Sequence, residues 1–170
     1  PIESADLSGL TIRTTPVYQA MFQSLGGNLV RTAPGDVYTA LERGTIDGYG
    51  WPAQGVLDLG WDEQTKYRVD PGFYQVDVDL IVNLDTWNGL GDEQKALLQR
   101  GVEWVEAKNA DNSKINEDEF AKQADAGIET ITLEGAEREK WLTAAQEEGW
   151  KAIAAVSADN AEKLRACLTN

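Results

Sequence analysis

The sequence contains no histidine, and this absence excludes several kinds of catalytic and metal site. Histidine-based triads, imidazole general bases and histidine-ligated metals are all impossible in this chain. Cysteine is nearly absent as well: Cys167 is the only one, so no disulfide can form within the chain. Because no histidine is present to activate its thiol, we interpret Cys167 as a small apolar residue of the last helix.

Basic residues and long apolar runs are also scarce. The 170 residues include 15 lysines and arginines against 29 aspartates and glutamates, a formal net charge of −14. Proteins that bind nucleic acid or anionic lipid carry the opposite balance, so we expect no nucleic-acid partner. No apolar run approaches the roughly 20 residues that cross a bilayer, so we expect no direct membrane insertion. Because the chain begins with Pro1, we interpret it as processed, trimmed or truncated upstream.

The first third of the chain alternates between strand and helix patterns. Five segments follow one another in the order strand, helix, strand, helix, strand: 10–15, 16–25, 28–32, 36–43 and 45–49. The strand segments are short, and the helix segments carry apolar residues at helical spacing. This alternation predicts an α/β fold with a parallel sheet covered by helices.

The stretch 36–54 contains the second helix and the third strand of this pattern, followed by a turn. Asp36 is a suitable N-cap, and Gly44 suits the end of the helix that follows. The next strand is short and rich in glycine, which predicts a place inside the sheet. In an open α/β sheet, ligands bind beyond the carboxyl ends of the strands. Tyr49 and Trp51 would therefore be presented to a ligand.

The rest of the chain predicts five longer segments. They are a helix and turn at 55–70, a long strand at 73–83, one long helix at 92–126 with a kink at Gly101, a strand at 128–133, and helix again at 136–168 with a break at 157–160. A strand of about ten residues is long for a small sheet and suggests a segment running between two lobes. The long helix is polar after residue 106, which indicates that it packs along a narrow stripe or across two lobes.

Arg13 is the strongest candidate for a binding residue. It ends a predicted strand just before a helix that begins near Pro16. A guanidinium beside a helix N-terminus makes an anion site, and its forked geometry favours a carboxylate held by two hydrogen bonds. In so acidic a chain, an anionic ligand needs a local cation. The alternative is a surface arginine paired with one of the many acidic residues.

Aromatic residues supply two candidate walls for such a pocket. Tyr49 and Trp51 form the first, because the glycines around them let the backbone approach another object closely. The second wall follows Pro71-Gly72 and consists of three consecutive residues: Phe73, Tyr74 and Gln75. For both walls the alternative is that the aromatic rings belong to the hydrophobic core.

Three ordered segments resemble the solute-binding proteins of TRAP transporters, the tripartite ATP-independent periplasmic family. They are SGLTIR at 8–13, DVYTALERGTIDG at 36–48 and VNLDTWNGLGDEQKALL at 82–98. The resemblance covers essentially the whole chain, which matches the C-terminal part of the family. It implies a periplasmic protein that captures a small organic anion and delivers it to membrane permease subunits.

The resemblance also implies a division of the chain. The family has a bilobed fold like that of other periplasmic binding proteins, with a long helix spanning the lobes. Residues 1–76 together with 120–170 would form the second α/β lobe, and residues 77–119 would supply a crossing strand and the long helix to the first. Most of the first lobe would then lie outside this chain.

The resemblance assigns roles to single residues. Arg13 falls at the family's arginine that pairs with the ligand carboxylate. Trp51 falls where many members have asparagine and where a subgroup that binds keto and hydroxy acids has Glu-Trp. In that subgroup two acidic residues help to hold a cation, but the corresponding positions here are Gly50 and Gln75. We therefore expect neither a metal nor another cofactor.

Two other functions stay open on the residues alone. A small carboxylate-handling enzyme would need a carboxylate base near Arg13, and Asp47 is the residue available for that role. A structural or partner-binding fragment would have no complete ligand site. Because the chain lacks G-x-G-x-x-G, P-loop and G-x-S-x-G motifs, we expect no catalytic residues.

Overall fold

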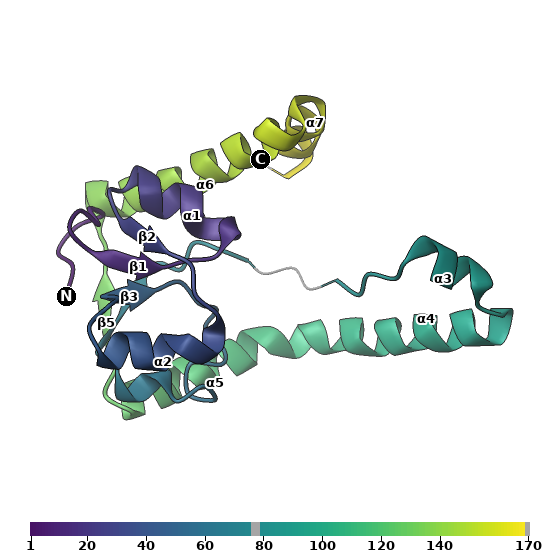
Figure 1. The fold of residues 1–170 in the computed structure, drawn as a ribbon, viewed down its shortest axis with the longest axis horizontal. Helices are drawn as coiled ribbons and strands as arrows, with labels where there is room; N and C mark the ends of the chain where they lie inside the picture. Colours follow the sequence, from purple (N-terminus) through teal and green to yellow (C-terminus); the bar gives the residue numbers. More distant parts are fainter. Residues whose placement is uncertain (76–78, 169–170) are drawn as a thin grey trace.

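The computed structural model describes residues 1–75 and 79–168. It consists of an α/β body and an arm that projects from it (Figure 1). In the arm (residues 79–107) the chain runs out to α3 (Leu84–Gly89) at the far end and returns toward the body along α4 (Asp92–Ala107). Within the described residues, no helix combines the length and the apolar character needed to span a bilayer.

The body contains the parallel sheet that the sequence predicts. Its three strands lie in the order β2 (Asn28–Val30), β1 (Thr11–Arg13), β3 (Gly48–Tyr49), and both pairings are parallel. The connections are α1 (Pro16–Ser24) and α2 (Pro34–Glu42), each with a proline in its first turn, where the missing N–H costs no hydrogen bond. The prediction of an α/β fold with this element order is confirmed.

A second sheet pairs two strands that are far apart in the sequence. β4 (Tyr67–Asp70) runs parallel to β5 (Glu129–Thr132), and the Nε of Arg68 donates to the Thr130 hydroxyl at 2.8 Å. The prediction of a helix and turn at 55–70 is therefore wrong in its last part: turns and a short 3₁₀ helix (Trp61–Glu63) lead into a strand. The charged residues of β4 weaken the strand pattern in the sequence, and the pairing with β5 stabilises the strand.

The long strand predicted at 73–83 is also wrong where the structure describes it. Residues 73–75 and 79–83 have no strand structure, and residues 76–78 lie outside the described part of the chain. A strand needs a neighbour for its backbone hydrogen bonds, and neither sheet includes this segment. Leu80 and Ile81 are accordingly 67% and 88% exposed.

The predicted long helix is present, but its interruption is elsewhere. α4 is followed by a 3₁₀ turn, η2 (Lys108–Asp111), and then by α5 (Asn112–Asp125). α4 continues through Gly101, so the interruption of the long helix lies at η2 and not at Gly101. Asn and Asp favour local side-chain bonds over the regular helix, which explains the break at η2. The final helices, α6 (Gly135–Val156) and α7 (Ala158–Leu168), are separated at Ser157, as predicted.

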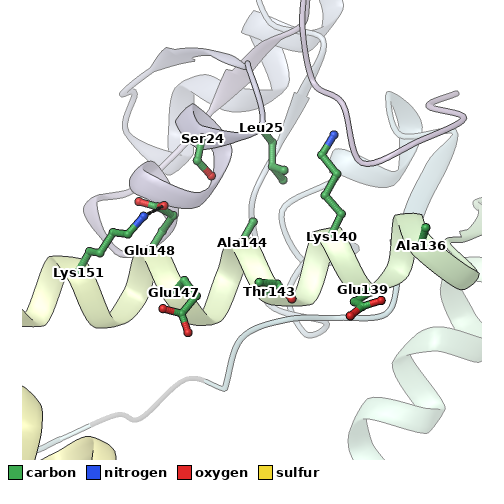
Figure 2. A pocket seen from close by; sticks show the side chains of 10 residues that line it. All are labelled: Ser24, Leu25, Ala136, Glu139, Lys140, Thr143, Ala144, Glu147, Glu148 and Lys151. Atoms are coloured by element: carbon green, nitrogen blue, oxygen red, sulfur yellow. Dashed lines mark hydrogen bonds and ion pairs between the residues drawn. The ribbon is translucent and has the colours of Figure 1, made fainter.

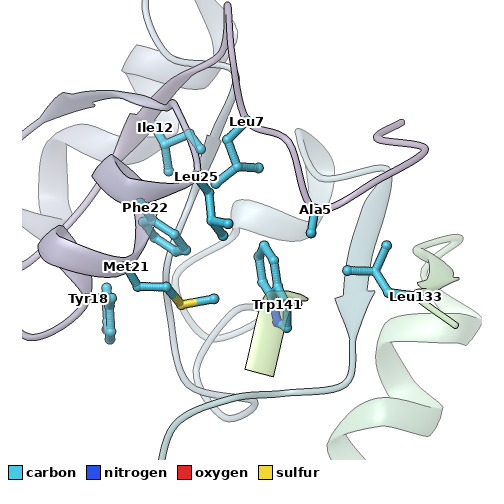
Figure 3. Close-up of a cluster of buried hydrophobic side chains, with 9 residues drawn as sticks. All are labelled: Ala5, Leu7, Ile12, Tyr18, Met21, Phe22, Leu25, Leu133 and Trp141. Carbon is cyan, nitrogen blue, oxygen red and sulfur yellow. The ribbon is translucent and has the colours of Figure 1, made fainter. Parts of the chain in front are cut away.

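Two hydrophobic clusters hold the body together. The α1–α6 core joins α1, the start of the chain and α6 around Trp141 (Figure 3). The Trp61 core lies beneath α2 and the loop after β3; its buried members are Val37, Ile46, Val56, Trp61 and Ile128. Because Ile128 lies directly before β5, the second cluster links the two sheets.

Candidate functional site

Arg13 lies at the carboxyl end of the central strand, with Val30 and Tyr49 as its neighbours in register. Its side chain is almost completely buried, at 3% exposure. The Thr32 carbonyl accepts from Nε at 3.3 Å and from Nη2 at 3.2 Å, and the Gly50 carbonyl accepts from Nη1 at 3.4 Å. The guanidinium is thus held by the two loops that follow β2 and β3.

The buried charge of Arg13 has no carboxylate partner among the described residues. The ion pairs in that part of the chain are all formed by other lysines and arginines on helices. Burying a charge is costly unless it is paired, and two carbonyl dipoles compensate a full positive charge only in part. The site therefore favours an anion beside Arg13.

Trp51 is an aromatic residue beside that charge. The central carbon of the Arg13 guanidinium lies 5.3 Å from the centroid of the Trp51 ring, within the range of a cation–π interaction. Trp51 is half-buried, and it packs edge-on against Trp61 at 4.8 Å between centroids. The structure therefore places Arg13 and Trp51 together, and Trp61 packs against Trp51 and supports its ring.

Tyr49 also packs against Trp61. Its ring lies 4.8 Å from that of Trp61, and its hydroxyl forms a 2.7 Å hydrogen bond with the hydroxyl of Thr65. Burial raises the pKa of Tyr49, and the hydrogen bond with Thr65 opposes this only in part. Tyr49 thus stays neutral and holds Trp61 in place.

The predicted second wall lies on the other side of Gly50. Phe73 is half-buried in the α1–α6 core, where it packs edge-on against Trp141 at 5.5 Å. Tyr74 is 46% exposed, and its ring lies 5.5 Å from that of Tyr18. Gln75 is exposed to solvent. Phe73 and Tyr74 thus pack beside Tyr18, which the sequence pattern marks only as part of a helical stripe.

Asp47, the candidate base of an enzymatic alternative, lies at the other end of β1. Its carboxylate accepts a 2.7 Å hydrogen bond from the backbone N–H of Thr11, while Arg13 lies at the carboxyl end of the same strand. In the part of the chain that the structure describes, no group of three or more acidic or cysteine side chains could hold a metal ion.

A groove on the surface lies away from Arg13. It has a volume of about 540 Å³ and runs between the end of α1 and α6 (Figure 2). Its charged side chains come from α6 and carry both signs: Glu139, Lys140, Glu147, Glu148 and Lys151. Lys151 pairs with Glu148 at 2.6 Å. This mixed, solvated surface has no buried polar group that would select a ligand.

The loop that carries Trp51 is fastened to α5. Gln123 is 4% exposed, and its side-chain amide donates to the Ala53 carbonyl at 2.7 Å. The Gln54 amide donates to the Asn116 side chain at 2.8 Å. The long helical segment α4–α5 is therefore connected to the loop beside Arg13, a link that sequence periodicity does not reveal.

Replacing Gln123 by methionine should lower the free energy of unfolding by about 1–2 kcal/mol. Methionine keeps the length of the side chain but removes the donor to the Ala53 carbonyl. Urea denaturation of the 170-residue chain would measure the change. The matched control is Gln99→Met, because Gln99 is exposed on α4; its effect should stay within about 0.5 kcal/mol. Equal effects of the two substitutions would contradict a role for Gln123 in holding the loop.

In a parallel α/β body, ligands bind beyond the carboxyl ends of the strands, and Arg13 lies there, buried and without a carboxylate partner among the described residues. The chain belongs to the bacterial extracellular solute-binding proteins of family 7: the family model, DctP, matches residues 1–155. The resemblance to TRAP solute-binding proteins is thereby confirmed.

Curated relatives support the same family. The chain is 31% identical over 134 residues to the 2,3-diketo-L-gulonate-binding periplasmic protein YiaO of Escherichia coli, covering 75% of this chain and 40% of that protein. It is 29% identical over 169 residues to the C4-dicarboxylate-binding periplasmic protein DctP of Rhodobacter capsulatus, covering 92% of this chain and 51% of that protein.

Solved structures agree with the fold. A TRAP periplasmic solute-binding protein from Pseudomonas putida F1, with bound D-glucuronate, superposes with a TM-score of 0.77 at 25% identity. The match covers 100% of this chain and 56% of that one. A TRAP protein from Desulfovibrio salexigens with bound orotic acid also gives a TM-score of 0.77, at 20% identity. The chain thus spans about half the length of these proteins.

Proposed function

We propose that this chain is part of the periplasmic solute-binding component of a TRAP transporter, which captures a small organic acid and delivers it to membrane permease subunits. The observation that carries the proposal is the buried Arg13 guanidinium without a carboxylate partner among the described residues. A ligand carboxylate supplies the missing charge. The curated relatives and several solved neighbours are named for acidic solutes.

The hydrogen bonds of Arg13 to carbonyls leave two of its N–H groups for such a ligand. Three of the five N–H groups of a guanidinium donate to carbonyls here. The remaining two, one on each terminal nitrogen, match the two oxygens of one carboxylate. Trp51 lies beside the charge and covers the carbon skeleton of the acid. A desolvated charge pair and an apolar contact then provide affinity, and no bond is made or broken.

The enzymatic alternative is less well supported. Asp47 is exposed and engaged by the Thr11 backbone at the far end of the strand from Arg13. A general base must reach the group from which it takes a proton. The matched relatives are binding proteins, in agreement with a function without catalysis. A fragment that only binds a partner protein would not need a buried arginine that has no carboxylate partner in the described part of the chain.

Binding of organic acids is best tested by thermal unfolding of the full-length protein as its gene encodes it. Acids and their uncharged amides form matched pairs: benzoate with benzamide, and succinate with succinamide. At 100 times its Kd, a ligand stabilises the native state by about 2.7 kcal/mol, which raises the Tm by several degrees. We expect the acids of a panel of such pairs, and not the amides, to produce this shift. The same shift with the amides, or none with any acid, would refute the proposal.

The arm supports the proposed division into lobes. In this division residues 1–76 with 120–170 form one lobe, and residues 77–119 complete another. Eight large apolar side chains of the arm are exposed: Leu80, Ile81, Leu84, Leu97, Leu98, Val102, Trp104 and Val105. The last five lie on α4, and an exposed apolar surface of this kind marks a contact area. Because the chain spans about half the length of its relatives, the first lobe of a longer protein is the fitting occupant.

Replacing Leu97 by serine should have different effects in two forms of the protein. In the 170-residue chain Leu97 is 62% exposed, so the free energy of unfolding should change by less than about 0.5 kcal/mol. In the full-length protein, where the first lobe would cover it, the loss should be about 2 kcal/mol or more. Denaturant unfolding measures both.

The control for this prediction is Glu103→Ser, on the opposite face of α4. We expect it to have a small effect in both forms, because Glu103 is exposed and contacts only Gln99 through a side-chain hydrogen bond. A small effect of Leu97→Ser in the full-length protein would contradict the assignment of the arm to the first lobe.

A further inference from the structure

Gly55 lacks a side chain at a place where the Trp51 ring takes the space. A Cβ atom on Gly55 would lie 3.1 Å from Nε1 of Trp51, which is shorter than a relaxed contact between non-bonded atoms. Gly55 also has a φ of +95°, in the left-handed region that side chains rarely adopt. The nitrogen edge of the indole ring therefore lies directly against the backbone of Gly55.

The backbone at Gly55 has little freedom to withdraw from that ring. Its carbonyl accepts from the Leu59 N–H at 3.1 Å. The carbonyl of Ala53, two residues earlier, accepts from the buried side chain of Gln123 on α5 at 2.7 Å. Val56, the next residue, is 6% exposed in the Trp61 core. A side chain at position 55 would therefore displace the Trp51 ring more than the backbone.

The Trp51 ring in turn lies beside the charge of the candidate site. The central carbon of the Arg13 guanidinium is 5.3 Å from the centroid of the ring. Trp61 packs against the same ring at 4.8 Å between centroids, with the two planes 64° apart. Because an indole ring is rigid, a displacement at its nitrogen edge also moves the part of the ring beside Arg13.

We propose that Gly55 is a positioning residue for the acid site. It lets the Trp51 ring lie against the loop backbone, in the orientation that places the ring beside Arg13. Gln123 supports this orientation, because it fastens the loop to α5. Since the nitrogen edge faces Gly55, Trp51 offers a ligand its apolar surface and not its N–H. This inference rests on the proposed binding of organic acids.

The position of the ring can be measured without a ligand, by NMR of the indole N–H signals of the 170-residue chain. The Trp51 signal is the one that disappears in Trp51→Phe. We expect Gly55→Ala to shift this signal by more than its line width. The control is Gly9→Ala: Gly9 has a φ of +84°, but nothing lies within 4 Å of its Cβ position, so strain arises there without a clash. An unmoved Trp51 signal in Gly55→Ala, or an equal shift in Gly9→Ala, would overturn the inference.

Acid binding is measured by calorimetry on the full-length protein, with the acid of the panel, such as benzoate or succinate, that gives the largest thermal shift. Gly55→Ala should weaken binding about fivefold or more, and Gly9→Ala should change it less than about twofold. Trp51→Phe keeps an aromatic surface without the indole nitrogen, so it should retain more binding than Trp51→Ala. In the Trp51→Phe background, Gly55→Ala should cost less than about twofold, because phenylalanine has no atom at the place of Nε1.

Three binding results would contradict the role of Gly55. They are equal affinities of Gly55→Ala and Gly9→Ala, the same loss from Gly55→Ala with tryptophan or phenylalanine at position 51, and a loss in Trp51→Phe as large as in Trp51→Ala. If Gly55→Ala does not fold, folding of its combination with Trp51→Phe supports the contact. If neither folds while Gly9→Ala does, backbone strain alone excludes a side chain at position 55, and the inference is wrong.

Failure of this inference is distinguishable from failure of the proposed function. An acid that stabilises the unchanged protein but binds Gly55→Ala equally well refutes only the role of Gly55. If no acid of the panel stabilises the protein, the proposed function fails, and the role assigned to Gly55 in acid binding fails with it.

Discussion

Replacing Arg13 by alanine is expected to weaken the binding of an organic acid by about 100-fold or more in the full-length protein. Removing one partner of a buried, hydrogen-bonded charge pair costs about 2–5 kcal/mol, and each 1.4 kcal/mol is a factor of ten in affinity. Arg13 is 3% exposed and is oriented by the carbonyls of Thr32 and Gly50, so its charge is desolvated and directed. Titration calorimetry with the acid that gives the largest thermal shift measures the loss.

Two further substitutions test the origin of that effect. Arg31→Ala removes an exposed arginine that contacts Gln19, so it should change affinity by less than about threefold. Arg13→Lys keeps the charge but loses the fork, and we expect it to recover only part of the binding. Circular dichroism must show that Arg13→Ala keeps its secondary structure. If folded Arg13→Ala bound the acid as tightly as the unchanged protein, the site assignment would be wrong.

Replacing Trp61 by alanine should lower the free energy of unfolding by about 3–5 kcal/mol. Trp61 is 1% exposed and supports two other aromatic rings, those of Tyr49 and Trp51, each at 4.8 Å. Truncation leaves a cavity that these rings cannot fill without moving. Because Trp51 lies beside the Arg13 guanidinium, we also expect weaker acid binding in any folded variant. Urea denaturation of the 170-residue chain, followed by circular dichroism, measures the stability loss.

Trp104→Ala is the matched control for this stability prediction. Trp104 is 67% exposed on α4 in the 170-residue chain, so its loss should change stability by less than about 0.5 kcal/mol there. The same chemical change is thus tested at a buried and at an exposed position. A loss at Trp61 no larger than that at Trp104 would show that the Trp61 core does not support the body.

Local patterns predict most of the elements of the body. The alternation from Leu10 to Tyr49 predicts β1, α1, β2, α2 and β3, because short-range spacing and proline or glycine positions determine these elements. The failures are at 55–70 and 73–83. β4 is a strand because β5, far away in the sequence, pairs with it. The segment after Phe73 has strand periodicity, but neither sheet offers it a neighbour in the described parts of 73–83.

In the candidate site, too, some residues can be predicted from their neighbours in the sequence and others cannot. Arg13 is predictable because its strand end and the following helix are both local features. Trp61 and Tyr18 are harder to predict: one lies in a turn, and the other lies on a helix whose apolar stripe indicates only core packing. Their packing depends on contacts with Trp51 and Gly50, residues that are distant in the sequence.

The sequence by itself determined the acidic charge, the absence of histidine chemistry, the parallel α/β order and the place of Arg13 at a strand end. These properties depend on composition and on neighbours along the chain. Only the tertiary structure decided that Arg13 is buried without a carboxylate partner among the described residues, and that the ring of Tyr18 takes the space beside Gly50. The physical reason is that burial, charge compensation and close packing depend on which distant segments come into contact. The spacing of residues along the chain does not determine these contacts.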